Sequence, residues 1–156
     1  MLKSENKSPE IKNKISAWID AYVLLDSDQK KVNLLLDRFL KLAHDNQDAG
    51  DFLPHELLQA LQDESTTFET LHNNAEQMKA MLISLPLVNL VLAYFASDNE
   101  LRRYAKLLRV KLQRSIIVST SYDPQVLGGV IIESGGKRFD FSLKFEVDQL
   151  FSQYKI

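Results

Sequence analysis

Polar and apolar residues repeat with the period of an α-helix over residues 8–84. Ser8-Pro9-Glu10 supplies an N-cap, a proline at the first helical position and an acid in the first turn. Four helices are predicted, with apolar stripes Ile11/Ile15/Trp18/Tyr22/Leu25, Val32/Leu35/Leu36/Phe39/Leu40/Ala43, Leu53/Leu57/Leu58/Leu61 and Phe68/Leu71/Ala75/Met78/Leu82. Thr66-x-x-Glu69 is the predicted capping box of the fourth. Short links favour antiparallel neighbours, so we expect a small antiparallel helical bundle.

The hydrophobic period changes at Pro86, and the preceding helix is not expected to continue through this proline. Residues 87–95 (LVNLVLAYF) are nearly all apolar, and their periodicity fits either a buried strand or a short buried helix. Ser97-x-x-Glu100 predicts a capping box that begins a helix. That helix directs inward Leu101, Tyr104, Ala105, Leu108 and Leu112. We therefore predict two domains, over residues 8–84 and 86–156.

A β-hairpin is the most sharply specified element. Residues 115–122 alternate as a strand with Ile116, Val118, Thr120 and Tyr122 on one face, and Asp123-Pro124 ends it. Gly135-Gly136 then forms a two-residue turn. The resulting pairs are Ser134–Lys137, Glu133–Arg138, Ile132–Phe139, Ile131–Asp140 and Val130–Phe141. This register places the apolar residues on one face and the Glu133–Arg138 ion pair on the other, and a slip of one residue would bury charges.

The fold class predicted from these elements is α+β. A closing helix is marked by Leu143, Val147, Leu150, Phe151 and Tyr154. The helical bundle is thus followed by a small mixed α/β unit that ends in the hairpin and this helix.

Composition is that of an ordinary globular chain. The 156 residues are 45% hydrophobic, carry a net charge of -2 and include no cysteine, which excludes disulfides and thiolate chemistry. Residues 1–97 hold 9 basic and 14 acidic side chains, whereas residues 98–156 hold 10 and 7, which suggests two units with different partners. No apolar run reaches the roughly 20 residues of a membrane span, and the first ten residues lack the apolar region of a signal peptide. We expect a cytoplasmic protein.

No catalytic, cofactor or metal site is predicted. His44, His55 and His72 have no metal-ligand spacing. The glycines before Lys137 do not fit a phosphate loop, because Ile131 and Arg138 replace the required glycine and hydroxyl residue. Six basic residues are spread over 101–114, a helix and its exit; they are Arg102, Arg103, Lys106, Arg109, Lys111 and Arg114. A solvated face explains them best, and nucleic acid, acidic lipid or the acidic residues of a partner helix are the alternatives.

The hairpin region resembles one family. Asp123-Pro124-x-Val126-Leu127-Gly128-Gly129-Val130, followed by a glycine turn and Asp140-x-Ser142-Leu143, is similar to the delta subunit of F-type ATP synthases, whose mitochondrial form is the oligomycin-sensitivity-conferring protein. The likeness lies mainly in residues 86–156. We interpret Asp123, Pro124, Gly128, Gly129, Asp140 and Ser142 as structural, with the glycine pair marking a bulge or a close backbone approach.

This resemblance implies a stator subunit in the peripheral stalk. Such a subunit joins the catalytic head to the membrane-anchored stalk and makes no bond, so it needs neither cofactor nor small-molecule substrate. The implied partners are the N-terminal helix of an alpha subunit, bound by the helical domain, and a b-type stalk subunit, bound by the C-terminal portion. Membrane association would occur only through this complex, on the inner face of the cell membrane.

Two alternatives to this function remain open at the level of sequence. One is an E-type stator subunit of a V-type, flagellar or secretion ATPase, although breaks at Asp26, Gly50 and Pro54 disfavour the long charged helix with which those proteins begin. The other is a nucleic-acid-binding module that uses the basic helix.

Candidate partner-binding residues in the helical domain come from its apolar stripes. Residues 15–22 (ISAWIDAY) do not match the family's Tyr-Ala-x-x-Leu-type pattern, so no contact residues are carried over from it. Trp18, Tyr22 and Phe39 are large enough to anchor an amphipathic helix, while burial in the bundle core is the simpler interpretation of Trp18 and Phe39.

Overall fold

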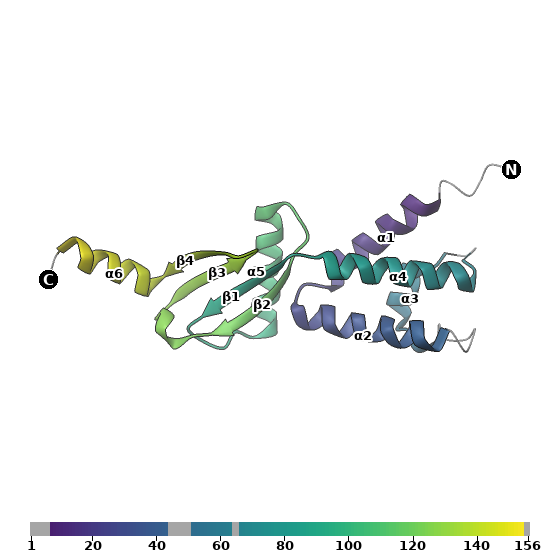
Figure 1. The fold of residues 1–156 in the computed structure, drawn as a ribbon, viewed down its shortest axis with the longest axis horizontal. Helices are drawn as coiled ribbons and strands as arrows, with labels where there is room; N and C mark the ends of the chain where they lie inside the picture. Colours follow the sequence, from purple (N-terminus) through teal and green to yellow (C-terminus); the bar gives the residue numbers. More distant parts are fainter. Residues whose placement is uncertain (1–6, 44–50, 64–65, 155–156) are drawn as a thin grey trace. The chain divides into compact units, whose positions relative to one another are not determined.

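The computed structural model describes residues 7–43, 51–63 and 66–154, and these form two compact units. The helical unit comprises residues 1–23 and 27–85, and the sheet unit comprises residues 24–26 and 86–156. Figure 1 shows the helices of the first unit in purple to teal and the strands of the second in teal to green. Helices and strands occur in the order that the α+β prediction requires, and that fold class is confirmed.

Four helices make up the described part of the helical unit: α1 (Lys7–Tyr22), α2 (Asp26–Ala43), α3 (His55–Leu61) and α4 (Phe68–Ser84). Their predicted stripes supply the core, whose largest fully buried side chains are Ile15, Leu36, Phe39, Leu57, Leu61, Met78 and Leu82. Side chains also bond backbone groups across the unit. The Asn74 amide, for example, donates to the Leu61 carbonyl at 2.7 Å and fixes α4 against the end of α3.

The cap of α4 differs from the prediction by one residue. Thr67 is the N-cap, and its hydroxyl accepts a hydrogen bond from the Thr70 amide at 3.3 Å. The Thr66 hydroxyl instead bonds Asp63, to whose carboxylate it donates at 2.9 Å. Since Thr66 is engaged by the preceding turn, the helix begins with its neighbour.

The sheet unit is built from β1 (Leu87–Leu92), α5 (Asp98–Leu112), β2 (Ile117–Tyr122), the short 3₁₀ helix η2 (Pro124–Val126), β3 (Gly129–Ser134), β4 (Lys137–Ser142) and α6 (Leu143–Tyr154). The strand order is β2-β1-β3-β4; β1 and β2 are parallel, and the other two pairs are antiparallel. Residues 87–92 are therefore a strand, which resolves the ambiguity of the LVNLVLAYF segment.

Two sequence predictions in the sheet unit are confirmed in detail. Every pair of the predicted hairpin register is present between β3 and β4. The capping box of α5 is also present: the Ser97 hydroxyl accepts from the Glu100 amide, and the Glu100 carboxylate accepts from the Ser97 amide at 2.9 Å. Local residue types were sufficient in both cases because turn and cap geometry depend on neighbours in the chain.

The core of the sheet unit lies mainly between α5 and one face of the sheet. Leu101 and Ala105 of α5 pack there with Val88, Leu90 and Leu92 of β1, Ile116 and Val118 beside or on β2, and Leu24 and Leu25 from the link between α1 and α2. The opposite face has a smaller cluster of Val91, Val126 and Ile131. Both faces of the central strands are therefore covered at least in part, which explains the almost continuous apolar run of β1.

Several residues that were predicted to face inward are exposed. Leu112, at the end of α5, is 45% exposed. The apolar stripe of α6 is also exposed, including Leu143, Leu150 and Phe151. The reason is that the main contacts of α6 are limited to β4 and η2. On the edge strand β4, Phe139 and Phe141 have the predicted register but remain more than half exposed.

Candidate functional site: two apolar grooves

The helical unit carries a hollow beside the predicted anchors Trp18 and Tyr22. Their rings stack at 5.0 Å between centroids, and both line a hollow of about 300 Å³ between α1, α2 and the start of α3. Tyr22 is 53% exposed, whereas Trp18 is half-buried. Phe39, the third candidate, is fully buried in the core and does not line the hollow. The structure thus brings two of the three candidates together.

A second hollow of about 470 Å³ continues along α2. It is lined by Leu35, Arg38, Lys41, Leu42 and Phe52, and it shares Leu35 with the first hollow. We call the two together the α2 groove. From Asp28 to Leu42 this surface follows α2 for about 21 Å at 1.5 Å per residue, which is the length of roughly four helical turns. Its floor is apolar, and its charged lining consists of Lys31, Arg38 and Lys41 together with the acids Asp28 and Glu56.

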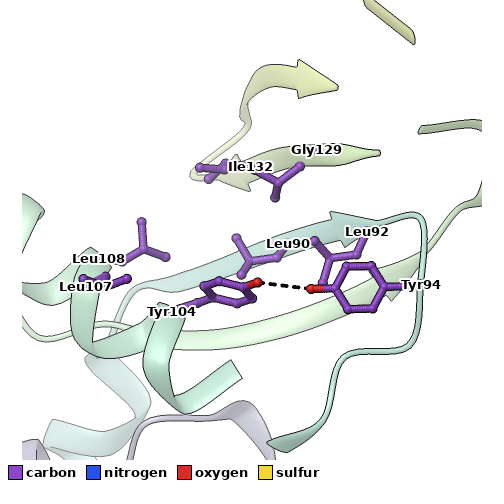
Figure 2. A pocket seen from close by; sticks show the side chains of 9 residues that line it. Leu90, Leu92, Tyr94, Tyr104, Leu107, Leu108, Gly129 and Ile132 are labelled. Carbon is purple, nitrogen blue, oxygen red and sulfur yellow. Dashed lines mark hydrogen bonds between the residues drawn. The ribbon is translucent and has the colours of Figure 1, made fainter. Parts of the chain in front are cut away.

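The sheet unit has its own groove, shown in Figure 2. This α5–β3 groove has a volume of about 480 Å³ and is lined by Leu90, Leu92, Tyr94, Tyr104, Leu107, Leu108, Gly129, Val130 and Ile132. It exists because α5 covers β1 and β2 but leaves the same face of β3 and β4 largely open, as the exposure of Phe139 and Phe141 shows. Apolar side chains dominate its surface.

Two tyrosines supply the polar atoms on the wall of the α5–β3 groove. The hydroxyls of Tyr94 and Tyr104 are 3.1 Å apart and share a hydrogen bond, drawn as a dashed line in Figure 2. That bond, together with partial desolvation and repulsion from Tyr104 and Glu100, raises the pKa of Tyr94 to about 12. The Tyr94 hydroxyl is therefore neutral at physiological pH.

The basic residues predicted on α5 divide into different roles. The Arg109 guanidinium donates twice to the Ile116 carbonyl, at 2.9 and 2.6 Å, and so secures the loop before β2. Arg103 and Lys111 are exposed and lie one helical turn before and after the groove residue Leu107. One predicted cation is therefore a fold contact, while two others flank the groove.

A polar row crosses the opposite face of the sheet. The Asn89 amide group donates to Ser121 Oγ at 3.0 Å and to Glu133 Oε2 at 3.1 Å, and its carbonyl accepts from Ser119 at 3.0 Å. Glu133 also forms the predicted ion pair with Arg138, with 3.0 Å between charged atoms. These groups satisfy one another across all four strands, so they stabilise pairing and do not converge on a reaction centre.

The family-like motif builds the junction between η2, β3 and α6. The Asp123 carboxylate accepts from the Gln125 amide at 2.9 Å and caps η2, whose first residue is Pro124. The Gly128 carbonyl accepts from the Leu143 amide at 3.0 Å. At Gly129, with φ +75°, a Cβ would lie 2.3 Å from the Phe141 carbonyl oxygen. A side chain at this position would therefore collide with backbone.

Asp140 and Ser142 form the start of α6. The Asp140 carboxylate accepts from the Ser142 amide at 3.0 Å, and buried Ser142 accepts from the Phe145 amide at 3.2 Å. Hydrogen bonds from Ser142, aided by Arg138 and Lys144, hold the pKa of Asp140 below its usual value. The motif residues are thus occupied by backbone geometry and helix capping.

In the described ranges 7–43, 51–63 and 66–154, the acidic and histidine side chains are spread over separate elements. No group of three potential metal ligands occurs there. None of the described helices combines the length and apolar character needed to cross a bilayer. His55 interacts with Gln59 at 2.8 Å on the surface of α3, and His44 lies outside the described residues.

An α+β fold whose candidate sites are apolar grooves flanked by charged side chains is typical of a protein that binds other proteins. Residues 23–153 match the family described as "ATP synthase delta (OSCP) subunit". The chain is also 29% identical over 101 residues to ATP synthase subunit delta of Ruthia magnifica subsp. Calyptogena magnifica; the alignment covers 65% of this chain and 51% of the relative. This chain spans about half the length of that curated relative.

The chain belongs to the ATP synthase delta (OSCP) subunit family, because the family match covers most of its length. Members are stator subunits of the ATP synthase complex and are structural rather than catalytic. The resemblance inferred from the hairpin region is therefore confirmed, and so is the prediction of a structural protein. The match begins at residue 23, so it includes most of the helical unit, which lies outside the hairpin region that carries the resemblance.

Proposed function

We propose that this protein is a stator subunit of a proton-translocating F-type ATP synthase that links the catalytic head to the membrane-anchored peripheral stalk. Its helical unit binds the N-terminal helix of an alpha subunit, and its sheet unit binds a b-type stalk subunit. It acts on the cytoplasmic side of the cell membrane, held there through the complex. Family membership supports the class of function, and the α2 groove is the observation that carries the proposed head contact.

The α2 groove has the length and surface that one amphipathic helix requires. Four turns of a bound helix would place apolar side chains against Trp18, Leu35 and Phe52 at helical spacing. The half-exposed Tyr22 would contribute area at one end, while the buried Phe39 would support α2 from beneath. Arg38 and Lys41 line the second hollow and favour acidic side chains on the part of the bound helix that lies there.

A titration with the N-terminal peptide of the alpha subunit from the same organism tests the head contact. Trp18 is the one tryptophan of the chain, so its fluorescence reports directly on this groove. We expect binding at about micromolar concentration, roughly -8 kcal/mol, with a negative heat-capacity change from apolar burial. The emission of Trp18 should change with the same midpoint as the calorimetric heat.

Neighbouring leucines on α2 provide a matched pair of variants. Leu35 lines both hollows, whereas Leu34 is 60% exposed and lines neither. Leu35→Glu should abolish binding of the peptide, and Leu34→Glu should preserve it. Equal affinity in both variants, or no binding by the wild-type protein, would argue against this use of the groove. Binding of a V-type stator peptide in its place would favour the E-type alternative.

A further inference from the structure

The apolar surface at the α5–β3 groove extends beyond the residues that line the groove. Leu107 on its wall is 62% exposed. On β4, Phe139 and Phe141 pair with Ile132 and Val130 of the groove floor and lie on the same face of the sheet. They are 51% and 61% exposed, so the apolar surface continues past β3 to the sheet edge. Exposed apolar surface of this kind marks an interaction site.

Cations lie beside this surface on both α5 and β4. Arg103 and Lys111 flank Leu107 on α5, one turn away on either side. Lys137 lies on the same face of β4 as Phe139 and Phe141, because alternate residues of a strand share a face. The two acids of the hairpin, Glu133 and Asp140, point to the opposite face of the sheet. There Glu133 accepts a hydrogen bond from Asn89, and Asp140 accepts one from the Ser142 amide at the start of α6.

The nearest acid on α5 is already engaged. Glu100 accepts hydrogen bonds from the Ser97 amide at 2.9 Å and the Ser97 hydroxyl at 2.8 Å, which hold its carboxylate at the N-terminus of the helix. The Tyr94 and Tyr104 hydroxyls bond each other. The groove therefore combines an apolar floor with a rim that carries Arg103, Lys111 and Lys137, and its neighbouring acid Glu100 is bonded in the cap of α5.

We propose that the α5–β3 groove binds an amphipathic helix of the peripheral stalk that carries acidic residues on both sides of its apolar stripe. This inference rests on the proposed function and specifies the surface and the chemistry of the stalk contact. Charge complementarity selects the partner: the apolar stripe covers Leu107, Val130 and the two phenylalanines, and the flanking carboxylates meet Arg103 and Lys111 on one side and Lys137 on the other.

A nucleic acid fits these observations less well. The floor is mainly aliphatic, its tyrosine hydroxyls are bonded to each other, and Arg109 donates to the Ile116 carbonyl, so this cation is held away from a phosphate backbone. The exposed phenylalanines of β4 are the one feature that would suit stacked bases, and the experiment therefore includes an oligonucleotide.

The test uses the full chain and the soluble part of the b-type stalk subunit from the same organism. A second probe is a pair of peptides from its head-proximal helix, one natural and one with each Glu and Asp replaced by Gln or Asn. We expect the natural peptide to bind more tightly, and salt to reduce the difference between the two. Arg103→Ala and Lys111→Ala should each lower the affinity for the natural peptide by about two- to fivefold and leave the affinity for the amide peptide unchanged.

Matched variants locate the contact. Leu107→Asp should abolish stalk binding, and because Leu107 is largely exposed the variant should fold normally, which the far-ultraviolet circular dichroism of the chain would verify. Leu107→Ala should weaken binding by a smaller factor. Lys106→Ala removes one positive charge from a different face of α5 and should have no effect on either peptide.

Failure of this inference can be distinguished from failure of the proposed function. If the stalk subunit binds the wild type and Leu107→Asp equally, or if Leu150→Asp on α6 alone abolishes binding, the stalk contact survives and the groove assignment is overturned. If an oligonucleotide binds and Leu107→Asp abolishes that binding, the groove belongs to nucleic acid. If neither the stalk subunit nor the alpha peptide binds, the proposed function itself fails.

Discussion

The amide of Val118 donates a hydrogen bond to the carbonyl oxygen of Leu24 at 3.0 Å. Leu25 pairs with Val118 as a parallel bridge, so the link between α1 and α2 adds a short fifth segment to the outer edge of β2. Leu24 and Leu25 are 4% and 3% exposed and pack with Leu90 and Ala105 in the core of the sheet unit. This segment both completes that core and covers an otherwise open strand edge.

The first prediction concerns this segment. Leu25→Ala should destabilise the sheet unit by about 2–5 kcal/mol, because it removes a buried side chain from a packed core. Amide hydrogen exchange in β2 should accelerate. Leu34→Ala, at a residue that is 60% exposed, should change the free energy of unfolding by no more than about 0.5 kcal/mol. Unchanged protection of the Val118 amide in Leu25→Ala would contradict the role of this segment.

The glycine-pair motif gives a second prediction. Gly129 and Gly136 both have φ +75°, but only at Gly129 would a Cβ collide with backbone. Gly136→Ala should therefore cost about 1–2 kcal/mol for the left-handed conformation alone. Gly129→Ala should cost about 1–3 kcal/mol more, and Gly129→Val should impair folding before it impairs any binding activity. Urea unfolding of the three variants checks the order. Equal stability of Gly129→Ala and Gly136→Ala would refute the close approach.

The capping box predicts an acid sensitivity of α5. Hydrogen bonds from Ser97 lower the pKa of Glu100 from its ordinary value of 4.5, so the folded state favours the ionised carboxylate. The stabilisation is therefore present above pH 4.5 and is lost as the pH falls through the lower folded-state pKa. Glu100→Gln should remove this part of the pH dependence. Ser97→Ala should cost about 1 kcal/mol at neutral pH. Unfolding midpoints measured across the acid range distinguish the two effects.

A fourth prediction concerns the tyrosine pair of the α5–β3 groove. Since the Tyr94 pKa is raised from 10.0 to about 12, the neutral phenol is favoured in the folded state. The linked stabilisation is full below pH 10.0 and disappears as the pH rises through about 12. Tyr104→Phe removes the hydrogen bond and should return the Tyr94 pKa toward 10.0. An ultraviolet titration of phenolate formation measures this shift, and identical titration curves for wild type and variant would exclude the interaction.

The sequence by itself determined the elements whose geometry depends on close neighbours in the chain. Gly135-Gly136 set the hairpin register, and Ser97 with Glu100 set the start of α5. The family resemblance was likewise visible in a short motif, because the backbone of η2, the close backbone approach at Gly129 and the cap of α6 each require particular residue types. One local prediction was wrong: Thr67 caps α4, since the Asp63 turn engages Thr66.

Only the tertiary structure decided which apolar surfaces are covered. Trp18 and Phe39 are both large apolar residues on helical stripes, yet Phe39 is fully buried while Trp18 lines a groove. Phe139 and Phe141 likewise have the pattern of a core face but remain exposed, because α5 covers the other half of the sheet. Leu24 and Leu25 show the converse, because they belong to a link between two helices and are nevertheless buried in the core of the sheet unit. Periodicity specifies the direction of a side chain relative to its own element, whereas burial depends on which distant element packs over it.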